Sequence, residues 1–253
     1  MEQVHIAIFI LVGFIAQIID GSLGMAYGVS SNAFLISLGV PPAVASASVH
    51  TSEVFTTLAS GLSHLKFGNI DSSLVKKLVI PGVIGGILGA YIISNVDNAL
   101  FKPLVALYLL VMGVRILLKA FQRRKERNSE DFKTLPLGIL GLLGGFFDAT
   151  GGGGWGPIVT TTLISQGSSP RKTIGSVNLT EFFVTVAESL TFVLTIGLVH
   201  WQVIIGLLVG GVIAAPLGAF FTQRIPMKSM MIMVGILIIF LNARTLFQVF
   251  GIL

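Results

Sequence analysis

The sequence predicts an all-α polytopic membrane protein made of two inverted repeats, each with five hydrophobic segments. The chain of 253 residues is 53% hydrophobic and only 11% charged, with a mean hydropathy of +0.92, whereas soluble domains carry about 25% charged residues. The apolar stretches are continuous, so they lack the alternating pattern of membrane β-barrel strands. A third observation is an internal repeat, which divides the chain into two similar halves.

The repeat is found by shifting the sequence by 128 residues, which lays 20–64 on 148–192 without a gap. Fifteen of these 45 pairs are identical, including Asp20/Asp148 and Glu53/Glu181. Shared apolar composition accounts for matched leucines but not for matched acids, so we infer a true structural repeat. The predicted units are membrane repeat 1 (1–120), a basic linker (121–133) and membrane repeat 2 (134–253).

Each half holds five hydrophobic segments in corresponding positions. They are 4–19, 28–38, 43–65, 73–94 and 99–120, then 134–147, 156–166, 171–196, 201–222 and 228–250. As helices, 28–38 and 156–166 would be only about 15 Å long, too short to cross about 30 Å of hydrocarbon. We therefore expect two short, re-entrant helix hairpins that meet near the membrane midplane, as in transporters with inverted repeats.

The positions of lysine and arginine predict the orientation, because cytoplasmic loops are enriched in both. With the basic linker inside, only Lys102 and Arg244 fall outside, and a loop that is basic in one half is neutral in the other. We expect a multi-pass protein of the bacterial inner membrane, with linker 121–133 cytoplasmic and both termini extracytoplasmic. The run 4–19 has no basic region before it and no small-residue cleavage pattern, so we expect it in the mature protein.

Polar residues recur along the third segment of each half. Their spacing places them on one helical face, and they are Ser46, His50, Glu53, Thr57, Ser60 and His64, then Asn178, Glu181, Thr185 and Glu188. Hydroxyl groups in such stripes often serve as interhelical hydrogen-bonding groups. A carboxylate costs about 2.5–3.5 kcal/mol at a helix centre on insertion scales, so we expect Glu53 and Glu181 to be functional and to carry protons.

Glycine-rich turns, Asp20–Gly28 and Asp148–Gly156, precede the two half-helices. Glycine lets a turn reverse tightly and lets backbone approach a solute, and a helix N-terminus attracts anions. Asp20 and Asp148 have two interpretations, a proton or ion site and a cap for the helix that follows. The residues that we expect to bind substrate are Ser22, Gly24, Tyr27, His50, Thr51, Gly152, Gly153, Trp155, Asn178 and Thr180.

Several function classes are disfavoured. Gly151, Gly153 and Gly156 fit the spacing of a dinucleotide-binding fingerprint, but the apolar run before them is not a soluble βαβ unit. The chain has no cysteine, which excludes disulfides and thiolate metal sites, and no His/Asp/Glu group has metal-ligand spacing along the sequence. We expect no cofactor, no metal and no nucleic-acid partner; the expected partners are a small anionic solute, the lipid bilayer and, in a homodimer, a second copy.

The stretch "GLLGGFFDATGGGGWGPIVTTTLISQG" and its partner "GFIAQIIDGSLGMAYGVSSNAFLISLG" resemble the TauE/SafE sulfite exporter family of bacterial membrane transporters. The following Pro42/Pro170 pair and the "HTSE" and "NLTE" stretches share this resemblance. Leu23, Met25 and Ala26 depart from the glycine pattern in the first copy. The resemblance implies movement of sulfite, sulfonates or related small sulfur-containing anions.

Three functions follow from these observations. The first is a secondary transporter of such an anion, coupled to protons through Glu53, Glu181, Asp20 and Asp148. The second is an uncoupled anion channel or uniporter with the same site. The third is an intramembrane aspartyl enzyme, which would need Asp20 and Asp148 to share a proton at close range; we expect the chain not to be an enzyme.

Overall fold

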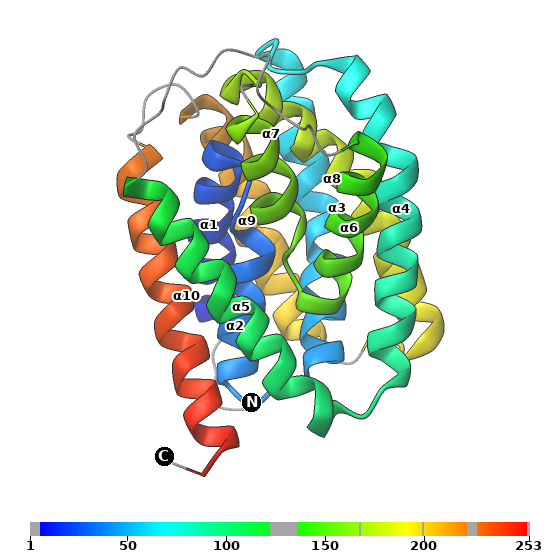
Figure 1. The fold of residues 1–253 in the computed structure, drawn as a ribbon, viewed down its shortest axis with the longest axis vertical. Coiled ribbons are helices and arrows are strands. Elements are labelled where there is room, and N and C mark those ends of the chain that lie inside the picture. The colour runs from blue at the N-terminus through cyan, green and yellow to red at the C-terminus, as the bar shows by residue number, and fades with distance from the viewer. Residues whose placement is uncertain (1–5, 122–135, 167, 199, 222–226, 252–253) are drawn as a thin grey trace.

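The computed structural model describes residues 6–121, 136–166, 168–198, 200–221 and 227–251, and these residues form helices and short connections without strands (Figure 1). Linker residues 122–133 and both extreme termini lie outside the described residues. The first half forms α1 (Ile6–Leu23), α2 (Tyr27–Ser37), α3 (Pro42–Lys66), α4 (Ser72–Asn95) and α5 (Asn98–Phe121). The second forms α6 (Leu137–Gly151), η1 (Gly156–Thr160), α7 (Thr161–Ser165), α8 (Pro170–Thr195), α9 (Trp201–Phe221) and α10 (Met227–Val249).

The all-α membrane class is confirmed. Six described helices are long and apolar enough to cross a membrane: α1, α4, α5, α8, α9 and α10. Large apolar side chains cover the outside of the bundle, for example Leu194 at 77% exposure and Phe240 at 66%. Polar side chains such as His50, Glu53 and Glu188 are buried. Exposed apolar side chains around an interior that holds buried ionisable groups fit a lipid-facing surface and differ from the pattern of a soluble protein.

The helices pack in corresponding pairs. α1 packs along α9 and α4 along α6, α5 lies beside α10 on one face, and α3 and α8 pack together in the interior (Figure 1). Exchanging the two halves turns the α1–α9 pair into the α6–α4 pair and leaves the α3–α8 and α5–α10 pairs unchanged. Corresponding helices of the two halves therefore make corresponding contacts. The inversion of one half relative to the other across the membrane stays a prediction.

Small residues allow the paired helices to approach closely. A Cβ on Gly89 of α4 would meet the Phe146 carbonyl of α6, and one on Gly13 of α1 would meet the Leu207 carbonyl of α9. Such backbone-to-backbone contacts are typical of helix pairs in membranes, where van der Waals packing replaces the hydrophobic effect. These pairs form the frame that holds α2, α3, η1 and α8.

Candidate functional site

Two interrupted helices bring backbone turns into the interior. We call residues 24–28, which connect α1 to the start of α2, the first tip, and residues 152–156, which connect α6 to the start of η1, the second tip. Both tips are fully buried, so α2 and η1 start inside the bundle. Gly24 and Gly152 take left-handed φ values of 65° and 66°, which end α1 and α6 at equivalent positions.

The two tips touch each other. A Cβ on Gly28 would lie 2.8 Å from the Gly153 Cα, and one on Gly156 would lie 2.5 Å from the Gly24 carbonyl oxygen. Side chains from each half close the contact, since Asn32 Nδ2 donates to the Gly151 carbonyl at 2.6 Å and Thr160 Oγ1 donates to the Gly24 carbonyl at 2.7 Å. The glycines are therefore required for contact between the tips.

Asp20 and Asp148 accept hydrogen bonds from the tips, as the capping interpretation predicts. Asp148 Oδ1 accepts from Gly154 N at 2.7 Å and from Trp155 N at 2.9 Å. Asp20 Oδ1 accepts from Tyr27 N at 3.5 Å, seven residues along the chain, the same offset as from Asp148 to Trp155. These carboxyl groups already accept hydrogen bonds from backbone N–H groups that we expected to bind an anion. An anion bound at the same N–H groups would have to displace a carboxyl group.

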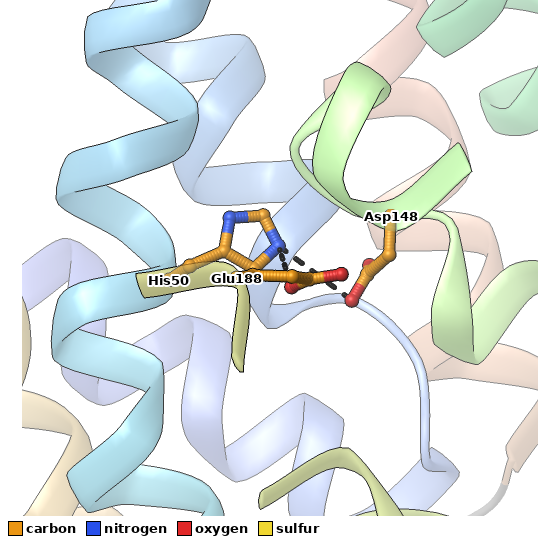
Figure 2. A group of neighbouring side chains, drawn as sticks. All are labelled: His50, Asp148 and Glu188. Atoms are coloured by element: carbon orange, nitrogen blue, oxygen red, sulfur yellow. Dashed lines mark ion pairs between the residues drawn. The ribbon is translucent and has the colours of Figure 1, made fainter. Parts of the chain in front are cut away.

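A cluster of ionisable side chains lies beside the second tip, where α3, α6 and α8 converge. Figure 2 shows the His50 ring of α3 pointing toward Glu188 of α8 and Asp148 of α6. His50 Nε2 lies 3.0 Å from Glu188 Oε2, 3.5 Å from Asp148 Oδ2 and 3.9 Å from Glu53 Oε2. All four side chains are almost fully buried.

A second polar pair lies at the equivalent positions of the other half. Asn178 corresponds to His50 and Ser60 corresponds to Glu188 under the shift of 128 residues. Ser60 Oγ donates to Asn178 Oδ1 at 2.7 Å. We call His50 and Glu188 the imidazole pair, and Asn178 and Ser60 the amide pair.

The centre is acidic. Five carboxyl groups are buried there, those of Asp20, Glu53, Asp148, Glu181 and Glu188, while no lysine or arginine is among the fully buried side chains that the structure describes. Several of the carboxyl oxygens have no hydrogen-bond partner within the protein, including Asp20 Oδ2, Glu181 Oε2 and Glu188 Oε1. Buried polar atoms are normally paired, so these oxygens indicate groups that are completed by a proton, an ion or a solute.

The other residues expected to bind substrate fall into two groups. Tyr27 and Trp155 anchor the tips, with the Tyr27 hydroxyl donating to the Leu207 carbonyl at 3.0 Å and Trp155 Nε1 donating to the Val177 carbonyl at 3.3 Å. Ser22, Thr51 and Thr180 donate to carbonyls of their own helices at 2.6–2.7 Å. The hydroxyl groups of Ser22, Thr51 and Thr180 therefore have a structural role, which is common for such groups in membrane helices.

Sequence reasoning did not select two features of the site. One is Glu188, which the sequence places on the polar face of α8, seven residues after Glu181. This spacing is the only feature of the sequence that indicates a role for Glu188. The other is a cavity of about 180 Å³ between α5 and α6, whose lining ends at Gly151, one residue before the second tip. Its lining residues are Phe101, Leu104, Val105, Tyr108, Phe146, Phe147, Thr150 and Gly151.

Comparison with known proteins agrees with this architecture. The family model for the sulfite exporter TauE/SafE matches residues 9–245. A probable membrane transporter protein, YtnM, of Bacillus subtilis (strain 168) is 46% identical over 247 residues, covering 94% of this chain and 82% of that protein. A probable membrane transporter protein of Haemophilus influenzae is 27% identical and covers 85% of this chain and 84% of its own length. No solved structure matches. Since the family match spans nearly the whole chain, the protein belongs to the sulfite exporter TauE/SafE family of membrane transporters.

Proposed function

We propose that this chain is a secondary transporter of a small sulfur-containing anion, such as sulfite or a sulfonate, and that transport is coupled to protons. The observation that carries the proposal is the contact of two glycine-rich tips in the interior, beside five buried carboxyl groups. Midplane sites between half-helices are typical of secondary transporters. The substrate class rests on the family, which is that of the sulfite exporter TauE/SafE.

The charge of the site supports coupling. An anion entering a centre with five carboxyl groups, and with no lysine or arginine among its described, fully buried side chains, would be repelled unless cations accompany it. Protons can supply that charge, because a buried carboxylate oxygen without a partner is costly in a membrane interior. We therefore infer that protonation of the carboxyl groups prepares the tips for an anion.

We place the proton carriers first at Glu181 and Asp20, with Glu53 and Asp148 as the other two groups predicted from the sequence. Glu181 and Asp20 have an unpartnered buried oxygen and no recorded ion pair with an imidazole. The ionisable groups whose charges act on Glu181 are those of Asp20, Glu53, Asp148 and Glu188. In this proposal Glu181 holds a proton while buried and exchanges it when the site opens to one side.

The test is anion flux in proteoliposomes, with and without an imposed pH gradient. Labelled sulfite, sulfoacetate, taurine and sulfate are compared, and a thermal-shift screen of the purified protein identifies the ligand class that binds. We expect one sulfur anion to accumulate with the gradient, and the Glu181→Gln variant to carry it without accumulation. If flux through the native chain does not depend on the pH gradient, the protein is an uncoupled channel or uniporter. Absence of flux for every sulfur-containing anion would refute the substrate class.

The geometry favours transport over an intramembrane aspartyl enzyme. Asp20 and Asp148 each bond the backbone of their own tip, and no hydrogen bond is recorded between these two described side chains. A dyad requires two carboxyl groups that share a proton. The inner-membrane location, the cytoplasmic linker 121–133, the extracytoplasmic termini and homodimer formation are parts of the same proposal that rest on the sequence.

A further inference from the structure

The hydrogen bonds of the His50 ring define which of its nitrogens faces the cluster. Nδ1 lies 2.8 Å from the Ser46 carbonyl oxygen and 3.2 Å from Ser46 Oγ. A carbonyl oxygen only accepts, so Nδ1 carries the hydrogen. Nε2 therefore points toward the three carboxyl groups either with a free lone pair or with a second proton.

A second proton on Nε2 would satisfy only part of this site. One N–H donates one strong hydrogen bond, yet oxygens of Glu188, Asp148 and Glu53 surround Nε2 at 3.0, 3.5 and 3.9 Å. Apart from these contacts with Nε2, both Glu188 oxygens, Asp148 Oδ2 and Glu53 Oε2 lack a hydrogen-bond partner in the protein. A divalent cation would satisfy a nitrogen lone pair and several carboxylate oxygens at once.

The distances between the donor atoms match a coordination shell. Metal–ligand bonds of about 2.1 Å place neighbouring ligands about 3.0 Å apart at octahedral angles and about 3.4 Å apart at tetrahedral angles. The observed separations from His50 Nε2 are 3.0 Å to Glu188 Oε2 and 3.5 Å to Asp148 Oδ2. One ligand atom from each of these residues lies within 4.8 Å of the others.

The groups around the cluster orient these ligands. Metal-binding histidines usually donate their other N–H to a carbonyl, as His50 Nδ1 does to Ser46. The other oxygen of Asp148 is held by two backbone N–H groups of the second tip. Glu188 packs against Gly86 of α4, where a Cβ would lie 2.6 Å from Glu188 Oε1.

We propose that His50, Asp148 and Glu188 form a binding site for a divalent transition-metal cation between α3, α6 and α8. The combination of one imidazole with two carboxylates fits first-row metals such as Zn²⁺ and Co²⁺ better than Na⁺ or Ca²⁺, which take oxygen ligands. The cation would offset the negative charge beside the second tip. The site stands on geometry and does not depend on which solute the protein transports.

Metal titration of the full-length chain tests the site. The protein is purified in detergent with a tag free of histidine, treated with a chelator, and titrated with Co²⁺ followed by visible absorption, and with Zn²⁺ by calorimetry. We expect one cation per chain and tetrahedral or five-coordinate Co²⁺ bands. His50→Asn and Glu188→Gln are each expected to weaken binding by more than about 100-fold, beyond the loss typical of outer-shell changes.

Control variants distinguish binding at this site from misfolding and from metal binding elsewhere in the chain. His50→Asn installs the residue found at the equivalent position 178, whose amide also donates to the carbonyl four residues earlier, so the variant is expected to fold. Ser60→Ala removes the neutral hydrogen bond at the equivalent position of the other half and should leave Co²⁺ binding unchanged. Lack of binding to the native chain, or equal binding to the His50→Asn and native chains, would overturn the proposal. Metal binding without anion flux would refute only the transport proposal, and flux without metal binding only the metal site.

Discussion

The imidazole pair and the amide pair occupy equivalent places in the two halves, yet they differ in chemistry. His50 Nδ1 donates to the carbonyl of residue 46, and Asn178 Nδ2 donates to the carbonyl of residue 174, which is the equivalent position. The far end of each side chain then meets the partner helix, Glu188 at 3.0 Å or Ser60 at 2.7 Å. The repeat has preserved the geometry of the contact and changed its charge.

This difference assigns separate tasks to the two pairs. A serine–asparagine hydrogen bond is neutral and fully satisfied, and it stabilises the α3–α8 contact. The histidine–glutamate contact leaves carboxylate oxygens without partners. Ion chemistry should therefore be concentrated on the side of the second tip, and the following variants test that asymmetry.

The largest effect is expected where the tips touch. Gly153 has a φ of 151°, and a Cβ there would meet the backbone nitrogen of Val29. Gly153→Ala should lower the free energy of unfolding by more than about 3 kcal/mol, measured by thermal unfolding in detergent and by size-exclusion profile. Gly39→Ala is the control, because Gly39 has a φ of 90° but nothing within 4 Å of a Cβ; its cost should be about 1–2 kcal/mol. Equal losses would mean that the tips separate readily.

The second variant pair compares Glu188 with its counterpart Ser60. Glu188→Gln should reduce transport by about tenfold or more, because it removes a charge from the imidazole pair. Ser60→Ala should reduce transport by less, because only one neutral hydrogen bond is lost. Initial rates in proteoliposomes at matched protein density give the comparison. A larger defect for Ser60→Ala would reverse the assignment of the two pairs.

The third pair compares the two tip carboxyl groups. Asp148→Asn should lower the free energy of unfolding by about 1–2 kcal/mol, because Asp148 accepts two short backbone hydrogen bonds. Asp20→Asn should cost less, because its bond from Tyr27 N is 3.5 Å long. Thermal unfolding in the presence of a chelator isolates capping from any bound cation. The opposite ranking would show that the distances do not reflect the strength of the caps.

The smallest effect is expected at the anchor of the first tip. Tyr27→Phe removes a hydroxyl that donates to the Leu207 carbonyl at 3.0 Å and should cost about 1 kcal/mol. Tyr91→Phe is a suitable control because Tyr91 is 58% exposed. The two melting temperatures are compared in the same detergent. If the Tyr27→Phe variant has the same melting temperature as the native chain, the first tip is held by its backbone contacts alone.

Much of the fold could be predicted from the sequence, because its causes are local. The predicted segments 28–38 and 43–65 correspond to α2 (Tyr27–Ser37) and α3 (Pro42–Lys66), since apolar runs, glycines and prolines mark where helices begin and end. The matched pair Asp20/Asp148 also identified both tips. The spacing of polar residues predicted one polar face on α3, and His50, Glu53 and Ser60 are indeed buried there.

The sequence by itself determined that the chain is a helical membrane protein with a repeat, because hydropathy and spacing depend only on residue order. Only the tertiary structure decided which polar groups meet. His50 lies in the first half, and Asp148 and Glu188 lie on two different helices of the second half. No local spacing could therefore predict that these three side chains converge. The tips likewise touch only because the α1–α9 and α4–α6 pairs hold them at one place. The distances between these side chains are fixed by that packing.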